Sequence, residues 1–311
     1  MLNIHELNVF IEAALAQNFS VAARRLYLSQ PAVSLHISNL EKQLGLELFR
    51  RNGRSIQLSA AGQALLPLAQ EAMRQVKHIE ETMWSLKGVL IGELSIACST
   101  TVGKYVLPRL VAGFRRKHPD VRVTVNIMSR RAAIDWLLSC RADMAVVSAR
   151  LNHGAELEYR DFLEDDIILI APPDHPWADG RTVVPADLLT VPFILRESTA
   201  GSYEVLLEGL NQHGLDIGQL PVALTLANAE AIEMSVEAGI GVAFVSRMAA
   251  SRGLALGKVV HVPVADMSLT RRIYMVRNVR HAITPLEQAF WEFVFAEEHE
   301  ELRQLSYAVR S

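Results

Sequence analysis

The chain has 311 residues, 50% of them apolar and 21% charged. This composition is typical of a cored globular protein rather than of disordered, fibrous or membrane-spanning chains, and the length predicts more than one domain. The net charge of −3 is uneven, because six basic and four acidic residues give the first 60 positions +2 and leave −5 for the rest. A basic excess at the N-terminus indicates where a nucleic acid would bind.

Three short helices are predicted near the N-terminus. Apolar residues on one face predict a helix over 7–14, and Ser20 can cap a second helix over 21–26. A third helix is predicted over 29–44. Two helices joined by a tight turn, with a short polar outward face on the second, follow the pattern of a DNA-binding helix-turn-helix.

A wing and a long helix are predicted next. Residues 48–58 indicate two short strands around an Asn-Gly turn. From Ser59, which can cap it, a helix is predicted whose apolar residues repeat at alternating spacings of four and three, as in a heptad seam. The seam residues are Leu65, Ala69, Ala72, Val76, Ile79, Met83 and Leu86. A second copy of the chain is the simplest partner for this seam, so we expect a homodimer.

The rest of the chain alternates short β-branched runs with amphipathic helices, which predicts an α/β domain. Strands are expected over 94–98, 121–127, 144–148, 167–170, 193–195, 222–226, 242–245 and 273–276. A change of pattern near Asp165 and a return near Asp266 predict two subdomains joined by crossover strands.

The N-terminal residues resemble the DNA-binding domain of LysR-type transcriptional regulators. The ungapped agreement is Phe19-Ser20-x-Ala22-Ala23-x-x-Leu26-x-x-Ser29-Gln30-Pro31-Ala32-Val33-Ser34-x-x-Ile37-x-x-Leu40-Glu41-x-x-Leu44-Gly45-x-x-Leu48-Phe49-x-Arg51. Ser59-Ala60-Ala61-Gly62 is similar to the family's Thr-x-Ala-Gly element, and Gly92-Glu93-Leu94-Ser95-Ile96 to the first strand of its effector domain. Residues 99–108 and 196–198 look closest to regulators of inorganic-carbon and sulfur assimilation.

This resemblance implies a two-lobed α/β effector domain, like type 2 periplasmic binding proteins, preceded by a mainly α winged helix-turn-helix domain and a long linker helix. The expected domains are 1–58 for DNA binding, 59–88 for dimerisation and 91–304 for the effector, with lobe I near 91–165 and 266–304 and lobe II near 166–265. The resemblance also implies double-stranded promoter DNA as a partner, a homodimer that pairs to a tetramer, and RNA polymerase as a further partner if the protein activates.

The start of the third helix is predicted to face DNA. Short polar or amide side chains there can reach base edges, so we assign Gln30 and Ser34 to bases and Pro31 to a thymine methyl group. Ser29 either caps the helix or binds a phosphate.

Three arginines surround the predicted wing turn: Arg50, Arg51 and Arg54. Guanidinium groups in a wing can follow phosphates or enter the minor groove. One of the three can instead serve a structural ion pair, and isolated arginines are usually solvated charges; the neighbouring helix-turn-helix favours DNA contact for Arg51 and Arg54. Glu41 is expected to act within the fold, because its charge repels phosphate.

Hydroxyl groups and arginines gather where predicted strands give way to helices, and such junctions bind small anions. We therefore expect a small-molecule effector, an anion, between the two lobes. The candidate residues are Ser99, Thr100, Thr101, Ser129, Arg130, Ser148, Arg196, Ser198 and Thr199. The alternative for each hydroxyl is helix capping, and for each arginine exposure to solvent.

No catalytic, cofactor or metal site is predicted. The histidines show no metal-binding spacing, and residues 239–242 follow a helix and lead into a strand, the reverse of a phosphate-binding loop. Asp165 and Asp166 are interpreted as a strand-edge charge pair rather than a catalytic dyad. Cys98 and Cys140 are expected to be buried, inert thiols.

The chain is expected in the cytoplasm without membrane association, because it shows neither a leader pattern at its start nor an apolar run near the ~18 residues of a membrane span. The leading hypothesis is a ligand-responsive DNA-binding regulator and not an enzyme. The alternative is a cytoplasmic small-molecule carrier with an accessory DNA-binding head, which ligand retention without DNA binding would favour.

Overall fold

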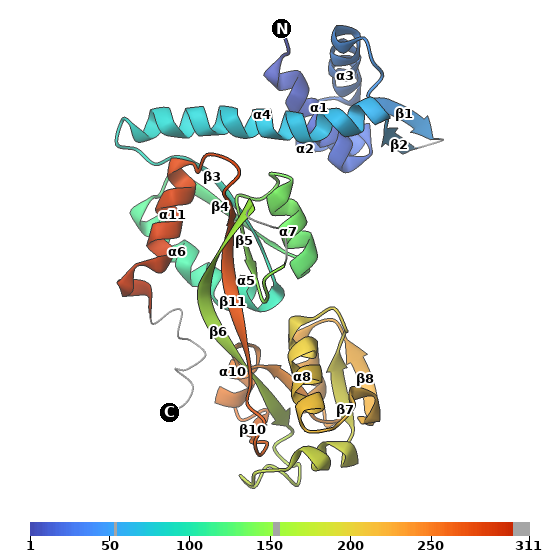
Figure 1. Ribbon diagram of the computed structural model, residues 1–311, viewed down its shortest axis with the longest axis vertical. Helices are drawn as coiled ribbons and strands as arrows, with labels where there is room; N and C mark the ends of the chain where they lie inside the picture. Colours follow the sequence, from blue (N-terminus) through green and yellow to red (C-terminus); the bar gives the residue numbers. More distant parts are fainter. Residues whose placement is uncertain (53–54, 152–155, 301–311) are drawn as a thin grey trace. The chain divides into compact units, whose positions relative to one another are not determined.

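The computed structural model describes residues 1–52, 55–151 and 156–300 (Figure 1). The chain forms two compact units. The first is Met1–Leu90 together with the short segments Leu138–Arg141 and Ala282–Pro285, and the second comprises the remaining described residues from Ile91 onward. Within the described ranges, no helix combines the length and the apolar character that crossing a bilayer requires.

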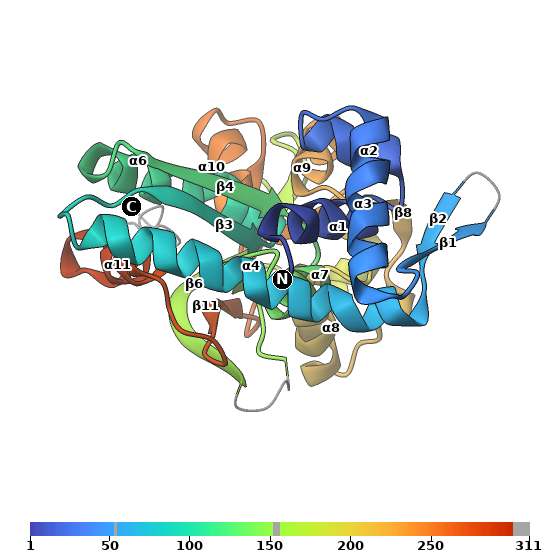
Figure 2. The same cartoon turned by 90° about the horizontal axis from the view of Figure 1, so that it is seen from above.

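The first unit consists of helices and one hairpin. Its elements are α1 (Ile4–Ala16), α2 (Phe19–Arg25), α3 (Gln30–Leu44), β1 (Phe49–Asn52), β2 (Ser55–Leu58) and α4 (Ala60–Ser85). α1, α2 and α3 gather around the N-terminal part of α4, and the β1–β2 hairpin lies at the same end (Figure 2). Phe10, Val33 and Leu40 lie in their shared core without exposed surface.

Local hydrogen bonds explain where these helices begin and end. The Asn18 side chain accepts the N–H groups of Ser20 and Val21 at 2.9 and 3.1 Å. Asn18 is therefore the N-cap of α2, and the assignment of that role to Ser20 was wrong because asparagine caps as well as serine and stands two residues earlier. At the other end of α3, Gly45 adopts a φ of +69°, which favours glycine and ends the helix.

The second unit has two lobes. Lobe I contains β3 (Gly92–Cys98), α5 (Thr100–Tyr105), α6 (Leu107–Lys117), β4 (Val121–Ile127), α7 (Arg130–Leu138), β5 (Met144–Val147) and α11 (Pro285–Phe295). Lobe II contains β7 (Phe193–Arg196), α8 (Gly201–Gln212), β8 (Val222–Leu226), α9 (Ala229–Glu237), β9 (Ala243–Ser246), α10 (Arg247–Ala255) and β10 (Val260–Val262). Short 3-10 helices occupy Pro185–Thr190, Ile217–Gln219 and Glu297–His299.

Two long strands run through both lobes, β6 (Leu157–Ala171) and β11 (Leu269–Asn278) (Figure 1). They pair antiparallel, with Leu269 opposite Ile167 at one end and Asn278 opposite Leu157 at the other. The sheet order is β10-β6-β11-β5-β3-β4, and β9 also pairs with β6. The predicted crossover is therefore confirmed, but the strands expected over 167–170 and 273–276 are only parts of these two, and β10 was not predicted.

Two sequence interpretations are wrong. Asp165 and Asp166 are not at a strand edge: they lie inside β6 and are 0% and 8% exposed. The expectation that both cysteines are buried is confirmed for Cys98, whose burial raises the pKa of its thiol to about 12. The same expectation is wrong for Cys140, which is only half-buried and lies in a turn after α7 with a φ of +54°. Both cysteines are free thiols.

Candidate functional site

The N-terminal turn of α3 presents the residues predicted to contact DNA. Gln30 and Pro31 are exposed, and Ser34 is half-buried. Ser29 is the N-cap of α3, and its Oγ accepts the N–H of Ala32 at 3.3 Å. Ser29 therefore has the capping role. The contacts of Gln30 and Ser34 with base edges and of Pro31 with a thymine methyl group remain predictions.

Two exposed residues near this turn were not predicted. Tyr27 is 97% exposed and has a φ of +55°, and Leu35 is 59% exposed on α3. The sequence signal for both is weak: each is a large apolar residue close to the start of the predicted DNA-contacting helix. Such a side chain is costly to expose unless a partner covers it.

The hairpin β1–β2 forms the predicted wing. Arg50 is exposed and pairs with Gln57 across the hairpin, and Arg51 lies in β1 opposite Ile56. Arg54 falls outside the described residues. Glu41 acts within the fold, since its Oε1 accepts the N–H of Leu48 at 2.8 Å and that of Phe49 at 3.3 Å, which fixes the hairpin to α3.

The predicted dimer seam on α4 has two parts. Leu65 and Ala69 pack into the core of the first unit. The remaining residues of the seam are half-buried or exposed: Ala72, Val76, Ile79, Met83 and Leu86. Leu68 is 68% exposed and stands four residues before Ala72, so it extends this exposed apolar face in place of Leu65 and Ala69.

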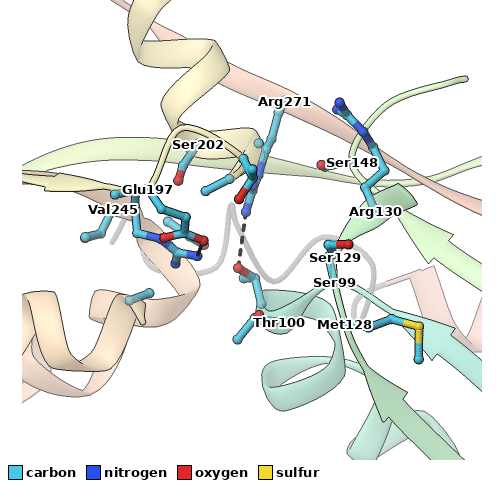
Figure 3. A pocket seen from close by; sticks show the side chains of 17 residues that line it. Ser99, Thr100, Met128, Ser129, Arg130, Ser148, Glu197, Ser202, Val245 and Arg271 are labelled. Carbon is cyan, nitrogen blue, oxygen red and sulfur yellow. Dashed lines mark hydrogen bonds and ion pairs between the residues drawn. The ribbon is translucent and has the colours of Figure 1, made fainter. Parts of the chain in front are cut away.

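A pocket of about 150 Å³ lies between the two lobes of the second unit. Figure 3 shows side chains of lobe I and of lobe II facing each other across it, with Arg271 between them. The predicted residues that line it are Ser99, Thr100, Thr101, Ser129, Arg130, Ser148, Arg196 and Thr199. Ser198 is exposed and does not line it. Hydroxyl groups that follow four strands, β3, β4, β5 and β7, thus line one cavity.

Ser99 and Ser129 differ in what their hydroxyl groups do. Ser99 occupies the N-cap position of α5 but makes no capping hydrogen bond, and its buried Oγ has no hydrogen-bond partner. Ser129 is engaged, because its Oγ accepts the N–H of Ala132 at 3.3 Å. A buried hydroxyl without a partner is costly, so Ser99 is the side chain with most to gain from a ligand.

The arginines of the pocket are already paired with carboxylates. Arg130 of lobe I donates to both carboxylate oxygens of Glu204 of lobe II, at 2.8 and 2.9 Å. Arg196 donates to the neighbouring Glu197 at 3.0 and 2.9 Å. An acidic ligand would therefore compete with, or be shared among, existing ion pairs.

Arg271 was missed by the sequence analysis. It is 9% exposed and donates from Nε and Nη2 to Asp165 Oδ2 at 2.8 and 2.7 Å, and from Nη2 to Thr101 Oγ1 at 3.2 Å. Ser246 Oγ donates to Asp165 at 2.6 Å. This buried network connects β6, β11 and lobe I at the back of the pocket. A Cβ at Gly201 would lie 2.5 Å from Ser148 Oγ and 3.2 Å from Arg271 Nη1, so glycine there leaves room for both side chains.

A second contact bridges the lobes beside the pocket. Lys104 Nζ and the hydroxyl of Tyr105, both on α5, lie 2.8 and 2.7 Å from the Glu230 carboxylate on α9. Burial alone would raise the pKa of Glu230, but Lys104 and Tyr105 outweigh burial and hold this pKa below its usual value. The same environment raises the pKa of Tyr105, first by burial and then by the hydrogen bond to Glu230.

A winged helix-turn-helix joined by a long helix to a two-lobed ligand domain defines the class of ligand-responsive DNA-binding regulators. The sequence matches the "Bacterial regulatory helix-turn-helix protein, lysR family" over residues 4–63 and the "LysR substrate binding domain" over residues 87–298. The chain therefore belongs to the LysR family of transcriptional regulators, with a DNA-binding head and an effector-binding domain.

Individual relatives agree with this assignment. The RuBisCO operon transcriptional regulator of Allochromatium vinosum is 30% identical over 95% of this chain and 96% of its own. The regulatory domain of CcmR from Synechocystis PCC6803, in complex with 2-PG, is 25% identical and covers 65% of this chain and 95% of its own, with a TM-score of 0.60. Full-length OxyR from Pseudomonas aeruginosa shares the fold, with a TM-score of 0.72 over 94% of each chain at 21% identity.

Proposed function

We propose that this regulator reads promoter DNA with the N-terminal turn of α3 and with the wing, and that an anionic effector between the lobes controls it. The domain limits 1–58, 59–88 and 91–304 belong to this proposal, as do a homodimer that pairs to a tetramer and a cytoplasmic location beside its DNA target. RNA polymerase becomes a partner if the protein activates. The observation that carries the effector proposal is the buried, unpartnered Oγ of Ser99 beside the Arg271 network.

The DNA proposal rests on the exposure of Gln30 and Pro31 at the start of a capped helix. The experiment is a fluorescence-anisotropy titration of the full chain against promoter DNA across salt concentrations. Because its relative regulates a RuBisCO operon, the upstream DNA of such an operon is the first to test, beside an unrelated duplex. The Gln30→Ala, Ser34→Ala double variant should lose sequence preference but keep salt-sensitive binding, since phosphate contacts remain.

Asn39→Ala is the matched control for this titration, because Asn39 is exposed on α3 and lies half a turn around the helix from Gln30. It should bind as the parent chain does. Selective binding that survives in the double variant would contradict the assignment of bases to α3, and no selective binding at any salt would favour the carrier alternative.

The effector proposal is tested by calorimetry on the full chain with sulfate, phosphate and 2-PG, the compound in the CcmR complex. Ser99→Ala should weaken binding of the active compound at least about tenfold, because it removes a donor that has no other use. Ser129→Ala, whose hydroxyl already caps α7, should weaken it less. Binding of neutral or apolar compounds only would contradict an anionic effector.

A further inference from the structure

A second cavity, of about 200 Å³, lies in lobe II. It opens where β6 exchanges one neighbour for another, because Leu269 of β11 pairs with Ile167 and Val262 of β10 pairs with Leu169. Between these two pairings, Ile168 of β6 has no strand partner on that side. Residues of the segment that connects β10 to β11 form part of the cavity wall there. None of the lining residues is shared with the pocket between the lobes.

The two cavities lie back to back across the same strands. Consecutive residues of a strand point to opposite faces, and neighbouring residues of β6, β9 and β11 are divided between the two sides in this way. On β9, Val245 lines the pocket between the lobes and Phe244 lines the second cavity. Asp165 bonds to Ser246 and Arg271, which line the pocket between the lobes. Asp166 instead pairs with Arg247 and accepts the hydroxyl of Thr270, on the side of the second cavity.

Arg247 is the polar group that a ligand would satisfy. Its side chain is 12% exposed, and its buried Nε has no hydrogen-bond partner. The nearest carboxylate oxygen, Oδ2 of Asp166, is 3.7 Å from Nε, which is beyond hydrogen-bond distance. The Asp166 carboxylate thus balances part of the charge of Arg247 without accepting this proton. Arg247 also lines the cavity, where its guanidinium group can pair with an acceptor oxygen of a ligand.

The rest of the wall limits what the occupant can be. Phe244, Val262 and Met267 are among its mostly apolar residues. His261 stands at the rim with much of its surface exposed, and the packed part of its ring together with the Arg247 charge lowers its pKa, so that a neutral imidazole is available for hydrogen bonding. The volume exceeds the ~150 Å³ of an apolar cavity that accepts benzene.

We propose that this cavity is a second ligand site, which binds a small monocarboxylic acid with an apolar body. The carboxylate accepts hydrogen bonds from Arg247, and the body packs against the apolar wall. A second acidic group would be disfavoured, because Asp166 lines the same cavity and would repel it.

The probe is benzoate, added to the full chain carrying 13C-methyl methionine and followed by NMR. Met267 lines the cavity and is one of nine methionines, so its methyl signal reports occupancy. Saturable binding with a Kd near ~1 mM or tighter is expected, with the Met267 signal shifting most. Arg247→Gln should weaken this binding at least about tenfold, whereas Arg252→Gln, exposed on the same helix, should leave it unchanged.

A second variant guards against loss of folding. Val264→Phe fills the cavity from its half-buried wall without touching Arg247, and it should abolish the Met267 shift while thermal unfolding stays cooperative. Ser99→Ala, in the other pocket, should leave benzoate binding intact. The proposal is overturned if benzoate causes no saturable Met267 shift, if Arg247→Gln binds benzoate as the parent does, or if Ser99→Ala abolishes the binding.

Discussion

Asp165 accepts hydrogen bonds from Arg271 and Ser246 while having no exposed surface. Asp165→Asn replaces the carboxylate to which Arg271 donates its hydrogen bonds by a neutral amide. The buried guanidinium charge of Arg271 then loses the negative partner that these hydrogen bonds provide. We expect the free energy of unfolding to fall by about 3–5 kcal/mol, as measured by urea denaturation.

Asp161→Asn is the control for that change. Asp161, on the same strand as Asp165, forms exposed ion pairs with Arg150 and Arg272. Such exposed pairs contribute under about 1 kcal/mol each. Equal losses in the two variants would show that burial of the Asp165–Arg271 pair has no special role.

At the residue scale, the sequence predicted what a local pattern can carry. The hydroxyl groups after β3 were found because they stand beside a strand end, and they line the pocket. Arg271 was missed because its partner Asp165 is 106 positions away, so their meeting depends on the register of β6 against β11. Asp165 and Asp166 were interpreted as a strand-edge charge pair for the same reason, since nothing nearby in sequence neutralises them.

At the scale of elements, the exposed apolar face of α4 is the surface expected to bind a second copy. Ile79 and Met83 are 60% and 51% exposed there. Ile79→Glu with Met83→Glu should turn the dimer into monomers without lowering helicity, because charges at a seam are repelled and desolvated. Analytical ultracentrifugation measures the change. Ser85→Lys should stay dimeric, because Ser85 is exposed and is neither three nor four residues away from any residue of this face. A dimer that persists in the double variant would reject the face.

The contact between α5 and α9 makes stability depend on pH. The pKa of Glu230 is lower in the folded chain than its ordinary value, so the folded state binds fewer protons than the unfolded state near that value. The stabilisation is present above the unfolded pKa of about 4.3 and is lost as the pH falls through the folded pKa.

The stability difference between the parent and Glu230→Gln should therefore be constant well above the ordinary glutamate pKa of about 4.3 and shrink as the pH falls below it. Thermal unfolding at a series of pH values measures it. A difference that stayed the same across this range would show that the carboxylate charge is not what stabilises the contact.

Element prediction succeeded where periodicity is local and failed where pairing decides. The run from Phe19 to Leu44 carries its own helix signals, and α3 begins and ends as predicted. The length of β6 was missed, because charged residues such as Asp161 and Glu164 precede the continuous apolar run, which begins only at Ile167. Those charges are tolerated because that part of the strand is partly exposed and both carboxylates pair with Arg272 of β11.

At the scale of the whole effector domain, the ion pairs between the lobes should bias how far the lobes close. Lys104 and Glu230 join the lobes but do not line the pocket. Lys104→Glu or Glu230→Lys alone places like charges together and should weaken effector binding several-fold by disfavouring the closed state.

The double charge swap should restore most of the affinity, because opposite charges face each other again. Calorimetry with the effector found for the parent chain measures each variant. Single variants that bind like the parent would show that closure does not depend on this pair.

The order of strands also affects how the chain folds as the ribosome makes it. β11 lies between β6 and β5 in the sheet, although it is the last strand to be synthesised. Until residues 269–278 emerge, β5 and β6 each expose an unpaired edge, and such edges template aggregation. A chain stopped after residue 266 should therefore be captured by chaperones or precipitate, whereas one stopped after 300 should stay in the supernatant. Cell-free synthesis followed by sedimentation would measure the difference. On this view, the sheet of the nascent chain is completed only when β11 inserts between β5 and β6.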